Sequence, residues 1–360
     1  MIMNTNLLPA DILAFENGLS SLTNELQGAH IFITGGTGFF GKWLLESIVF
    51  LNNRFSLQIK ATVLTRNPRA FLEQMPHLAN IKELSFVRGD VMDFSLPVSP
   101  YTHFIHAATE ASAKLAADNP LLMIDTVVTG TRRTLDFAVD CGAKTFLLTS
   151  SGGIYGTQPP EISHISENCL HGPDTTLTPY CYHEGKRMAE MLCCAYAKKH
   201  NLEAKIARCF AFAGPHLPLN SHFAIGNFID DALKGKPIKI SGDGTPLRSY
   251  MYAADLVVWL WTILLKGRTG RPYNVGSDIP ISIENLAHKI SLVVPEIMGS
   301  QISTPLQVQI AQQAQPGNLP TRYVPNVDRA KTELGLSLSV GLDESIARTA
   351  KWWAQFLAAQ

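Results

Sequence analysis

The chain has 360 residues, and its 30 Lys and Arg residues are balanced by 30 Asp and Glu residues, so the formal net charge is zero. Hydrophobic residues make up 46% of the chain and charged residues 17%, which is typical of a folded globular protein and excludes a disordered one. Because there is no excess of basic residues, we expect neither a nucleic acid nor an anionic membrane surface as a partner.

The N-terminal residues lack the charged start and continuous apolar stretch of a signal peptide. The longest apolar run, LVVWLWTILL at residues 256–265, is far shorter than the roughly 20 residues that a membrane span needs. The six cysteines form no CxxC pair and no metal-ligand spacing. We therefore expect a cytoplasmic protein with reduced thiols, a buried helix at the apolar run, no membrane segment and no metal.

Short β-type segments alternate with helical segments through the first half of the chain. The helical segments fall near residues 39–51, 120–140 and 181–200, and the β-type segments include HIFITGG, LQIKATVLTR, LSFVRGD, THFIHAA, KTFLLTSS and EAKIARC. This alternation predicts an α/β protein with a parallel sheet covered by helices on both faces. Pro and Gly become dense after residue 210, which indicates a second, smaller lobe.

The segment TGGTGFFG follows the first β-type run and opens a helical one, the context in which such a glycine pattern binds a dinucleotide. Gly35 permits a tight turn, Gly38 lets the backbone approach a pyrophosphate, and Gly41 lets the helix pack against the sheet. The N–H groups at the helix start then face the phosphates. The alternative is a glycine-rich turn that binds no ligand.

The second β-type run ends in VLTRNP, which places Arg66 where an NAD-binding protein usually has an acidic residue for the ribose 2′-hydroxyl. A guanidinium suits a 2′-phosphate, so NADP is favoured over NAD. Arg66 alternatively lies in solvent or on the adenine while NAD binds. Asp90, at the end of LSFVRGD, is a candidate contact to the adenine edge or a simple turn residue.

Tyr182 and Lys186 in YHEGK are four residues apart on a helical segment and share one face. A nearby ammonium and an oxidised nicotinamide would both favour the phenolate, and we therefore expect the pKa of Tyr182 to be lowered. Lys186 is also a candidate to hold the nicotinamide ribose of the cofactor. Ser151 stands at the end of the strand segment KTFLLTSS, where its hydroxyl reaches the substrate oxygen, unless it only stabilises a turn.

Taken together, TGGTGFFG, FIHAAT, TSSGGIYG, YHEGK, GDGTPLRSYMYAADLV and YNVGS resemble the extended short-chain dehydrogenase/reductase family, in its nucleotide-sugar epimerase/dehydratase branch. The resemblance spans residues 29–355. It implies a Rossmann-like doubly wound parallel sheet over residues 29–210, preceded by an extension at 1–28. A smaller C-terminal α/β lobe at 211–360 then binds a nucleoside diphosphate sugar and returns some segments to the Rossmann domain. It also implies a homodimer and catalysis by Ser151, Tyr182 and Lys186 at a sugar carbon, usually C4.

The same resemblance assigns further site residues by position in the matching motifs. The implied cofactor set comprises Gly35, Thr37, Gly38, Phe39, Phe40, Arg66, Asp90, Val91, Ala107, Ala108, Thr109, Tyr182 and Lys186. The implied substrate set comprises Ser151, Gly152, Asn227, Arg248 and Arg322, with Arg248 at the nucleotide diphosphate. A helix cap for Asn227 and a surface position for Arg248 are the alternatives.

The chain departs from the pattern that it resembles at several positions. Where the 4,6-dehydratases carry Asp-Glu and the uronate decarboxylases carry Glu after the strand-end Ser/Thr, this chain has Gly152 and Gly153. Three polar positions of relatives are also changed, to Val127, Ala211 and Gln315. His183 and His222 are interpreted as surface or satisfied polar residues.

An NDP-sugar 4-epimerase needs only Ser151, Tyr182 and Lys186, and it is the favoured prediction. An NADPH-dependent 4-keto-sugar reductase is the alternative, and a 4,6-dehydratase or a uronate decarboxylase ranks lower because the carboxylate is missing. A dinucleotide-binding regulator is the non-enzyme alternative. The apolar faces at residues 121–139 and 188–196 are candidates for a homodimer contact, or else for packing within one subunit.

Overall fold

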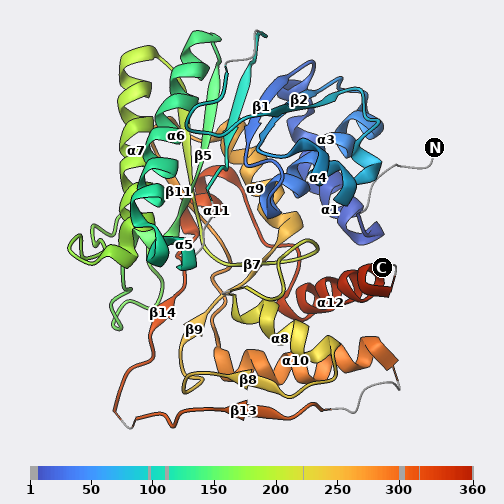
Figure 1. The fold of residues 1–360 in the computed structure, drawn as a ribbon, viewed down its shortest axis with the longest axis vertical. Helices are drawn as coiled ribbons and strands as arrows, with labels where there is room; N and C mark the ends of the chain where they lie inside the picture. Colours follow the sequence, from blue (N-terminus) through green and yellow to red (C-terminus); the bar gives the residue numbers. More distant parts are fainter. Residues whose placement is uncertain are drawn as a thin grey trace.

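The structure is a computed structural model, and it describes residues 7–95, 99–109, 113–221, 223–299, 305–315 and 317–358. Figure 1 shows two parts, a helix-covered sheet and a lobe below it that contains β8, β9, β13, α8, α10 and α12. A mixed α/β fold with a parallel sheet, as the sequence predicts, is confirmed.

The large sheet has seven strands in the order β11-β6-β5-β4-β1-β2-β3, and every neighbouring pair is parallel. The order reverses between β1 and β4, which creates the crevice where ligands bind in open α/β sheets. The strands are β1 (His30–Thr34), β2 (Lys60–Thr65), β3 (Leu84–Arg88), β4 (His103–His106), β5 (Thr145–Ser151), β6 (Glu203–Cys209) and β11 (Pro272–Val275).

Two hydrophobic cores cover the two faces of this sheet, because alternate residues of each strand point to opposite sides. In β1, Ile31 and Ile33 join one core while Phe32 joins the other. The first core includes residues of α1 (Pro9–Leu19), α3 (Phe39–Phe55) and α9 (Ala253–Lys266). The second includes residues of α6 (Pro120–Asp140) and α7 (Cys181–His200).

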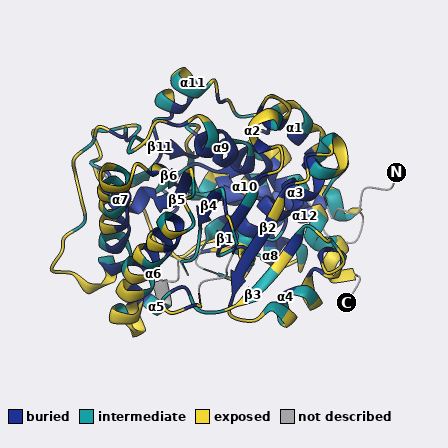
Figure 2. Ribbon diagram, turned by 90° about the horizontal axis from the view of Figure 1, so that it is seen from above, coloured by how far each residue is buried: buried dark blue, intermediate teal, exposed yellow. Residues whose placement is uncertain are grey.

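The apolar run at 256–265 forms the centre of α9 and is almost wholly buried, as Figure 2 shows by its dark colour. Indole and hydroxyl groups inside this core are satisfied, since Trp261 Nε1 donates to Ser47 Oγ at 2.8 Å. Among the described residues, no helix combines the length and the apolar character that crossing a bilayer requires.

The smaller lobe has its own core, formed mainly by α8, α10 and α12. Both the three-stranded sheet β12-β9-β14 and the pair β13-β8 belong to this half of the chain. The remaining strands are β7 (Phe212–Ala213), β8 (Ile238–Ile240), β9 (Leu247–Arg248), β10 (Met251–Tyr252), β12 (Ile281–Ser282), β13 (Val308–Ile310) and β14 (Arg322–Tyr323). The remaining α-helices in the described part of the chain are α2 (Thr23–Leu26), α4 (Pro68–Gln74), α5 (Ala113–Asp118), α8 (Ala224–Leu233), α10 (Ile283–Met298), α11 (Asp328–Leu334) and α12 (Leu342–Ala358).

The second half of the chain also contributes to the large sheet. β11 pairs with β6 through residues 272–275 and 206–209, and α9 packs against β5 and β6. The N-terminal helix α1 packs against α3 and α9. The large sheet therefore takes one edge strand, β11, from the second half of the chain, while α1 packs on two of the helices that cover the sheet.

Candidate active site

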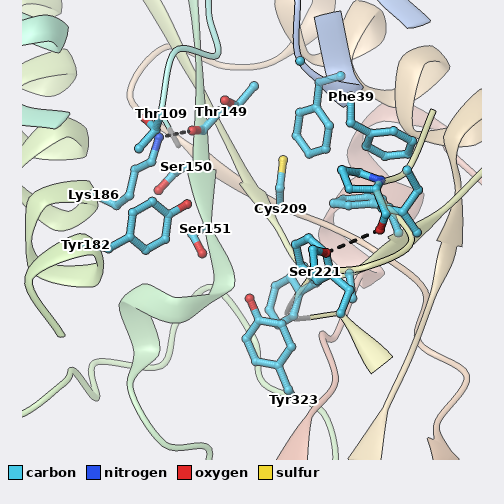
Figure 3. A pocket seen from close by; sticks show the side chains of 18 of the residues that line it. Phe39, Thr109, Thr149, Ser150, Ser151, Tyr182, Lys186, Cys209, Ser221 and Tyr323 are labelled. Carbon is cyan, nitrogen blue, oxygen red and sulfur yellow. Dashed lines mark hydrogen bonds between the residues drawn. The ribbon is translucent and has the colours of Figure 1, made fainter. Parts of the chain in front are cut away.

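A cavity of about 890 Å³ opens at the carboxyl ends of the central strands, between the large sheet and the lobe. Figure 3 shows side chains from both parts facing this space, with Tyr182, Lys186 and Ser151 on one side and Phe39 and Ser221 on the other. The cavity wall includes ten residues of the predicted site, namely Gly35, Gly38, Phe39, Phe40, Ala107, Thr109, Ser151, Tyr182, Lys186 and Arg248.

The glycine turn is held too tightly for side chains at two of its positions. Gly35 has φ +70°, and a Cβ atom there would lie 2.3 Å from the carbonyl oxygen of Ala107. A Cβ atom at Gly41 would lie 2.2 Å from the carbonyl carbon of Gly36. By contrast, a Cβ atom at Gly38 would have only one atom within 4 Å, the carbonyl oxygen of Gly35 at 3.4 Å. The turn therefore leaves space over Gly38, on the cavity side.

Helix α3 begins at Phe39, with Gly38 as its N-cap. A glycine offers no side-chain acceptor to the first N–H groups of the helix, so these donors point toward the cavity end of β1. Backbone donors and the positive end of a helix dipole together favour phosphate groups. The residues present thus fit the pyrophosphate of a dinucleotide.

Ser151, Tyr182 and Lys186 meet where β5 ends beside the first two turns of α7. Lys186 is only 2% exposed, and its ammonium donates a hydrogen bond to the carbonyl of Thr149 at 2.8 Å. Ser151 Oγ accepts a hydrogen bond from the backbone N–H of Gly153 at 3.0 Å. These bonds fix both groups against the strand end, so the three residues form one preorganised cluster.

Burial dominates the ionisation of this cluster. It raises the pKa of Tyr182 to about 12, although a hydrogen bond with Ser151 opposes the rise, and it lowers the pKa of Lys186 to about 8. The pKa of Tyr182 is therefore raised in the protein alone, and its lowering stays a prediction for the protein with an oxidised dinucleotide bound. Lys186 directs its ammonium to Thr149, and its Nζ lies 5.8 Å from the centre of the Tyr182 ring.

Tyr323 is a wall residue that the sequence did not single out. It lies on β14 beside Arg248 of β9, and both residues line the cavity. Burial raises the pKa of the Tyr323 phenol, opposed by its hydrogen bond to Ser151. The predicted substrate residue Arg322 precedes Tyr323 in the strand and is not part of the wall. The sequence PTRYVP contains both residues, and only the strand register distinguishes them.

Eight predicted site residues lie outside the cavity wall, namely Thr37, Arg66, Asp90, Val91, Ala108, Gly152, Asn227 and Arg322. Arg66 is exposed directly after the end of β2. Asp90 Oδ1 accepts from the N–H of Met92 at 3.0 Å, which is the bonding of a turn residue. Asn227 lies in α8 about one turn beyond the wall residues Phe223 and Ala224.

The two glycines after Ser151 are surrounded by bulky side chains. A Cβ atom at Gly152 would lie 2.7 Å from the Phe210 ring and 2.8 Å from the Tyr323 hydroxyl oxygen. At Gly153 it would lie 1.9 Å from Cδ2 and 2.3 Å from Nε2 of His183. His183 also lines the cavity. The sequence interpretation of His183 as an ordinary polar residue thus missed a cavity residue, while His222 lies outside the described residues.

The other departures from the family pattern differ in their placement. Ala211 lines the cavity, so the loss of a polar group there changes the wall itself. Val127 is fully buried and packs against the position of Gly185. Gln315 is exposed and accepts a hydrogen bond from Asn318.

Metal ligands are not gathered in the described part of the chain, where no group of three or more His, Cys, Asp or Glu side chains is placed to hold an ion. The six cysteines are free thiols. Polar and titratable side chains that line the cavity include Ser151, Tyr182, Lys186, His183, Cys209, Arg248 and Tyr323.

A sequence profile described as the NAD dependent epimerase/dehydratase family matches residues 31–276, which is most of the chain. The chain belongs to this family, and it is an NAD(P)-dependent enzyme of the extended short-chain dehydrogenase/reductase type. The predicted family membership is thereby confirmed, and the alternative of a regulator is set aside.

Among curated proteins, the chain is 29% identical over 338 residues to UDP-glucuronic acid decarboxylase 1 of Xenopus tropicalis, covering 94% of this chain and 75% of the relative. It is also 29% identical over 318 residues to UDP-glucuronic acid decarboxylase 6 of Arabidopsis thaliana, covering 88% and 86%.

Solved structures with the same fold include a dTDP-glucose 4,6-dehydratase from Streptomyces venezuelae with NAD bound, at a TM-score of 0.75 and 22% identity, covering 92% of this chain and 98% of that one. Another is UDP-glucose 4-epimerase from Thermotoga maritima with UDP-glucose, at a TM-score of 0.74 and 22% identity, covering 91% and 99%. These likenesses establish a shared fold.

Proposed function

We propose that this protein oxidises and re-reduces one carbon of a nucleoside diphosphate sugar, C4, and that its net reaction is 4-epimerisation. The observation that carries this proposal is the cluster of Ser151, Tyr182 and Lys186 on the wall of one cavity with the glycine turn. Relatives that act on nucleotide sugars support the substrate class.

In this mechanism, Ser151 and Tyr182 hold the sugar hydroxyl, and Tyr182 takes its proton as the carbon is oxidised. A bound oxidised dinucleotide supplies a hydride acceptor and a positive charge that lowers the pKa of Tyr182. Lys186 anchors the ribose, since its ammonium is already fixed by Thr149. Tyr182 then returns the proton when the ketone is reduced.

Substrate binding is assigned to the lobe side of the cavity. Arg248 lines the wall there, and its guanidinium suits the diphosphate, because planar donors bind phosphate oxygens in pairs. NADP remains our preferred cofactor on the strength of Arg66, which follows the strand end where the ribose 2′-position is recognised. Affinities for NAD⁺ and NADP⁺, measured side by side, test that preference.

UDP-glucuronate decarboxylation is the second candidate, because the curated relatives quoted above carry that name. It shares the oxidation step at C4. The glycines at 152 and 153 weigh against it, since the uronate decarboxylases that this chain resembles carry a glutamate there. A 4-keto-sugar reductase would use the same three residues with NADPH consumed in each turnover.

The test begins with the purified protein, which is denatured so that any released dinucleotide can be identified. Tightly held oxidised dinucleotide supports an internal redox cycle, whereas an empty protein that consumes NADPH supports the reductase. The protein is then incubated with UDP-glucose, UDP-N-acetylglucosamine, dTDP-glucose and UDP-glucuronate, and products are separated by ion-exchange chromatography. A 4-epimer supports the first candidate, and UDP-pentose with released CO₂ supports the second.

Tyr182→Phe is the variant that links this turnover to the cluster. We expect a loss of about 10²–10⁴-fold in turnover with dinucleotide binding kept, because general acid–base groups contribute about that much. Tyr196→Phe on the same helix is the control, since Tyr196 donates to Asp136 on α6 and lies outside the cavity wall. Full turnover in Tyr182→Phe would contradict the mechanism.

A homodimer is part of the proposal. Helices α6 and α7 pack together and leave large apolar side chains exposed on the outside, namely Leu121, Leu122, Ile124, Met188 and Met191. Exposed apolar groups of this kind, gathered on neighbouring helices, are typical of protein contacts.

A further inference from the structure

His183 and Gly153 compete for one volume at the rim of the catalytic cluster. The imidazole edge of His183 lies within 1.9–2.3 Å of where a Cβ atom on Gly153 would stand. No side chain at position 153 fits while the ring is there. The ring thus occupies the place from which, in the dehydratases and uronate decarboxylases that this chain resembles, a carboxylate side chain extends.

One ring nitrogen of His183 lacks a hydrogen-bond partner in the described part of the chain. Nδ1 of His183 is buried and has no hydrogen-bond partner among the described residues. Buried polar atoms are nearly always paired, so an unpaired one in an active-site wall calls for an explanation. His183 packs against the rings of Tyr180 and Tyr182, at 5.6 and 5.4 Å between centroids, so its position beside the catalytic phenol is fixed.

Burial lowers the pKa of His183, so the imidazole is neutral near pH 7 and has one nitrogen able to accept a proton. Its protonated form would place an unpaired charged N–H group in a buried position, which is unfavourable. A proton accepted by this ring is therefore readily given back. That behaviour suits a group that transfers protons in both directions.

We infer that His183 is a second acid–base residue of this cavity, besides Tyr182, and exchanges a proton with the sugar carbon next to the carbon that Tyr182 helps to oxidise. The inference rests on the proposed oxidation at C4 and adds a second step to it. Oxidation turns C4 into a ketone, which makes hydrogens on the neighbouring carbons acidic.

In this step, a C–H bond beside the ketone breaks and its proton forms an N–H bond on the imidazole. The electron pair of the broken bond forms a C=C bond, and the negative charge passes to the C4 oxygen. Ser151 and Tyr182 are placed to hydrogen bond that oxygen. Return of a proton from His183 to the same carbon restores the ketone, and no further oxidant or reductant is consumed.

The step has a signature that 4-epimerisation alone lacks. In D₂O, protons on His183 exchange with solvent, so deuterium enters the sugar at a carbon next to C4. The protein with its dinucleotide is incubated in D₂O with UDP-glucose, UDP-N-acetylglucosamine, dTDP-glucose and UDP-glucuronate. Proton NMR and mass spectrometry locate the deuterium, while nicotinamide absorbance follows oxidation at C4.

His183→Asn removes the base and keeps a polar side chain of similar size. We expect deuterium incorporation to fall by about 100-fold or more, as general base catalysis contributes at least this much. The nicotinamide signal should persist, because Ser151, Tyr182 and Lys186 are all present. His200→Asn, an exposed position at the end of the same helix, is the matched control and should exchange like the unaltered protein.

Gly153→Ala tests the same inference without altering His183. The new methyl group would displace the ring, so deuterium incorporation should fall here too. Incorporation that survives in both variants overturns the assignment of His183. Oxidation at C4 without any deuterium at a neighbouring carbon in the unaltered protein also overturns it and leaves the proposed function standing. If no oxidation occurs with any of the four sugars, the proposed function fails, and the inference fails with it.

Discussion

Two glycines of the same turn should respond differently to one methyl group. Gly35 has a positive φ of +70°, and a Cβ atom there would come within 2.3 Å of Ala107 O. Gly38 has a φ of −81°, and a Cβ atom there would meet only Gly35 O at 3.4 Å. The pair Gly35→Ala and Gly38→Ala therefore separates the strain of the turn from its role in binding.

For Gly35→Ala, left-handed backbone costs an alanine about 1–2 kcal/mol, and forcing β4 and its following loop apart costs about 1–3 kcal/mol more. We expect the free energy of unfolding to fall by about 2–5 kcal/mol. For Gly38→Ala the conformation is accessible, so stability should stay within about 1 kcal/mol of the original. Its methyl group, however, enters the space next to the helix start and should weaken dinucleotide binding at least about tenfold.

Thermal and urea unfolding measure the first effect, and calorimetric titration with NAD⁺ and NADP⁺ measures the second. The reasoning about the phosphate cradle is refuted if Gly38→Ala binds both dinucleotides as tightly as the unaltered protein. The reasoning about strain is refuted if Gly35→Ala unfolds at the same denaturant concentration as the unaltered protein.

Two further predictions concern charge and assembly. Burial lowers the pKa of Lys186 from 10.5 to about 8, so between these pH values the unfolded chain holds a proton that the folded chain lacks, and folding stability from this residue rises with pH by up to about 1.4 kcal/mol per unit. The free energy of unfolding of Lys186→Met, measured with urea at pH 8–9.5, should not show this rise. If the free energies of unfolding of Lys186→Met and the unaltered protein change with pH in parallel, the prediction is contradicted. Met188→Glu with Met191→Glu, at positions 49% and 64% exposed, should convert a dimer to a monomer in light scattering, whereas Leu170→Glu, at a 93% exposed loop position, should not.

The fold was predictable where apolar periodicity is strong. The helical segments expected at 120–140 and 181–200 coincide with α6 and α7, and KTFLLTSS contains β5 almost to the residue. β11 was not predictable in the same way, because PYNV has four residues, starts with proline and lies among turn signals. Its place in the sheet depends on pairing with β6.

The grouping of Ser151, Tyr182 and Lys186 in one cavity was predictable, because these residues stand in two short motifs, one at a strand end and one at a helix start. The positions of Tyr323 and His183 in the cavity wall were not predictable, because each residue reaches the wall beside a residue that is distant in sequence. His183 is thirty positions from Gly153, and only the folded backbone places its ring over that glycine. The signal in the sequence was a bulky residue after the tyrosine, combined with two glycines after the serine.

The late arrival of β11 has a consequence for biosynthesis. A nascent chain that has emerged only as far as β6 presents the backbone N–H and C=O groups of residues 206–209 as an open edge, and their partners at 272–275 are still to be made. Open edges of parallel sheets pair readily with other chains. We therefore expect the yield of native protein to depend on how well this edge is protected until α9 and β11 emerge. A bound chaperone would provide that protection, and so would a delay in the folding of the first six strands.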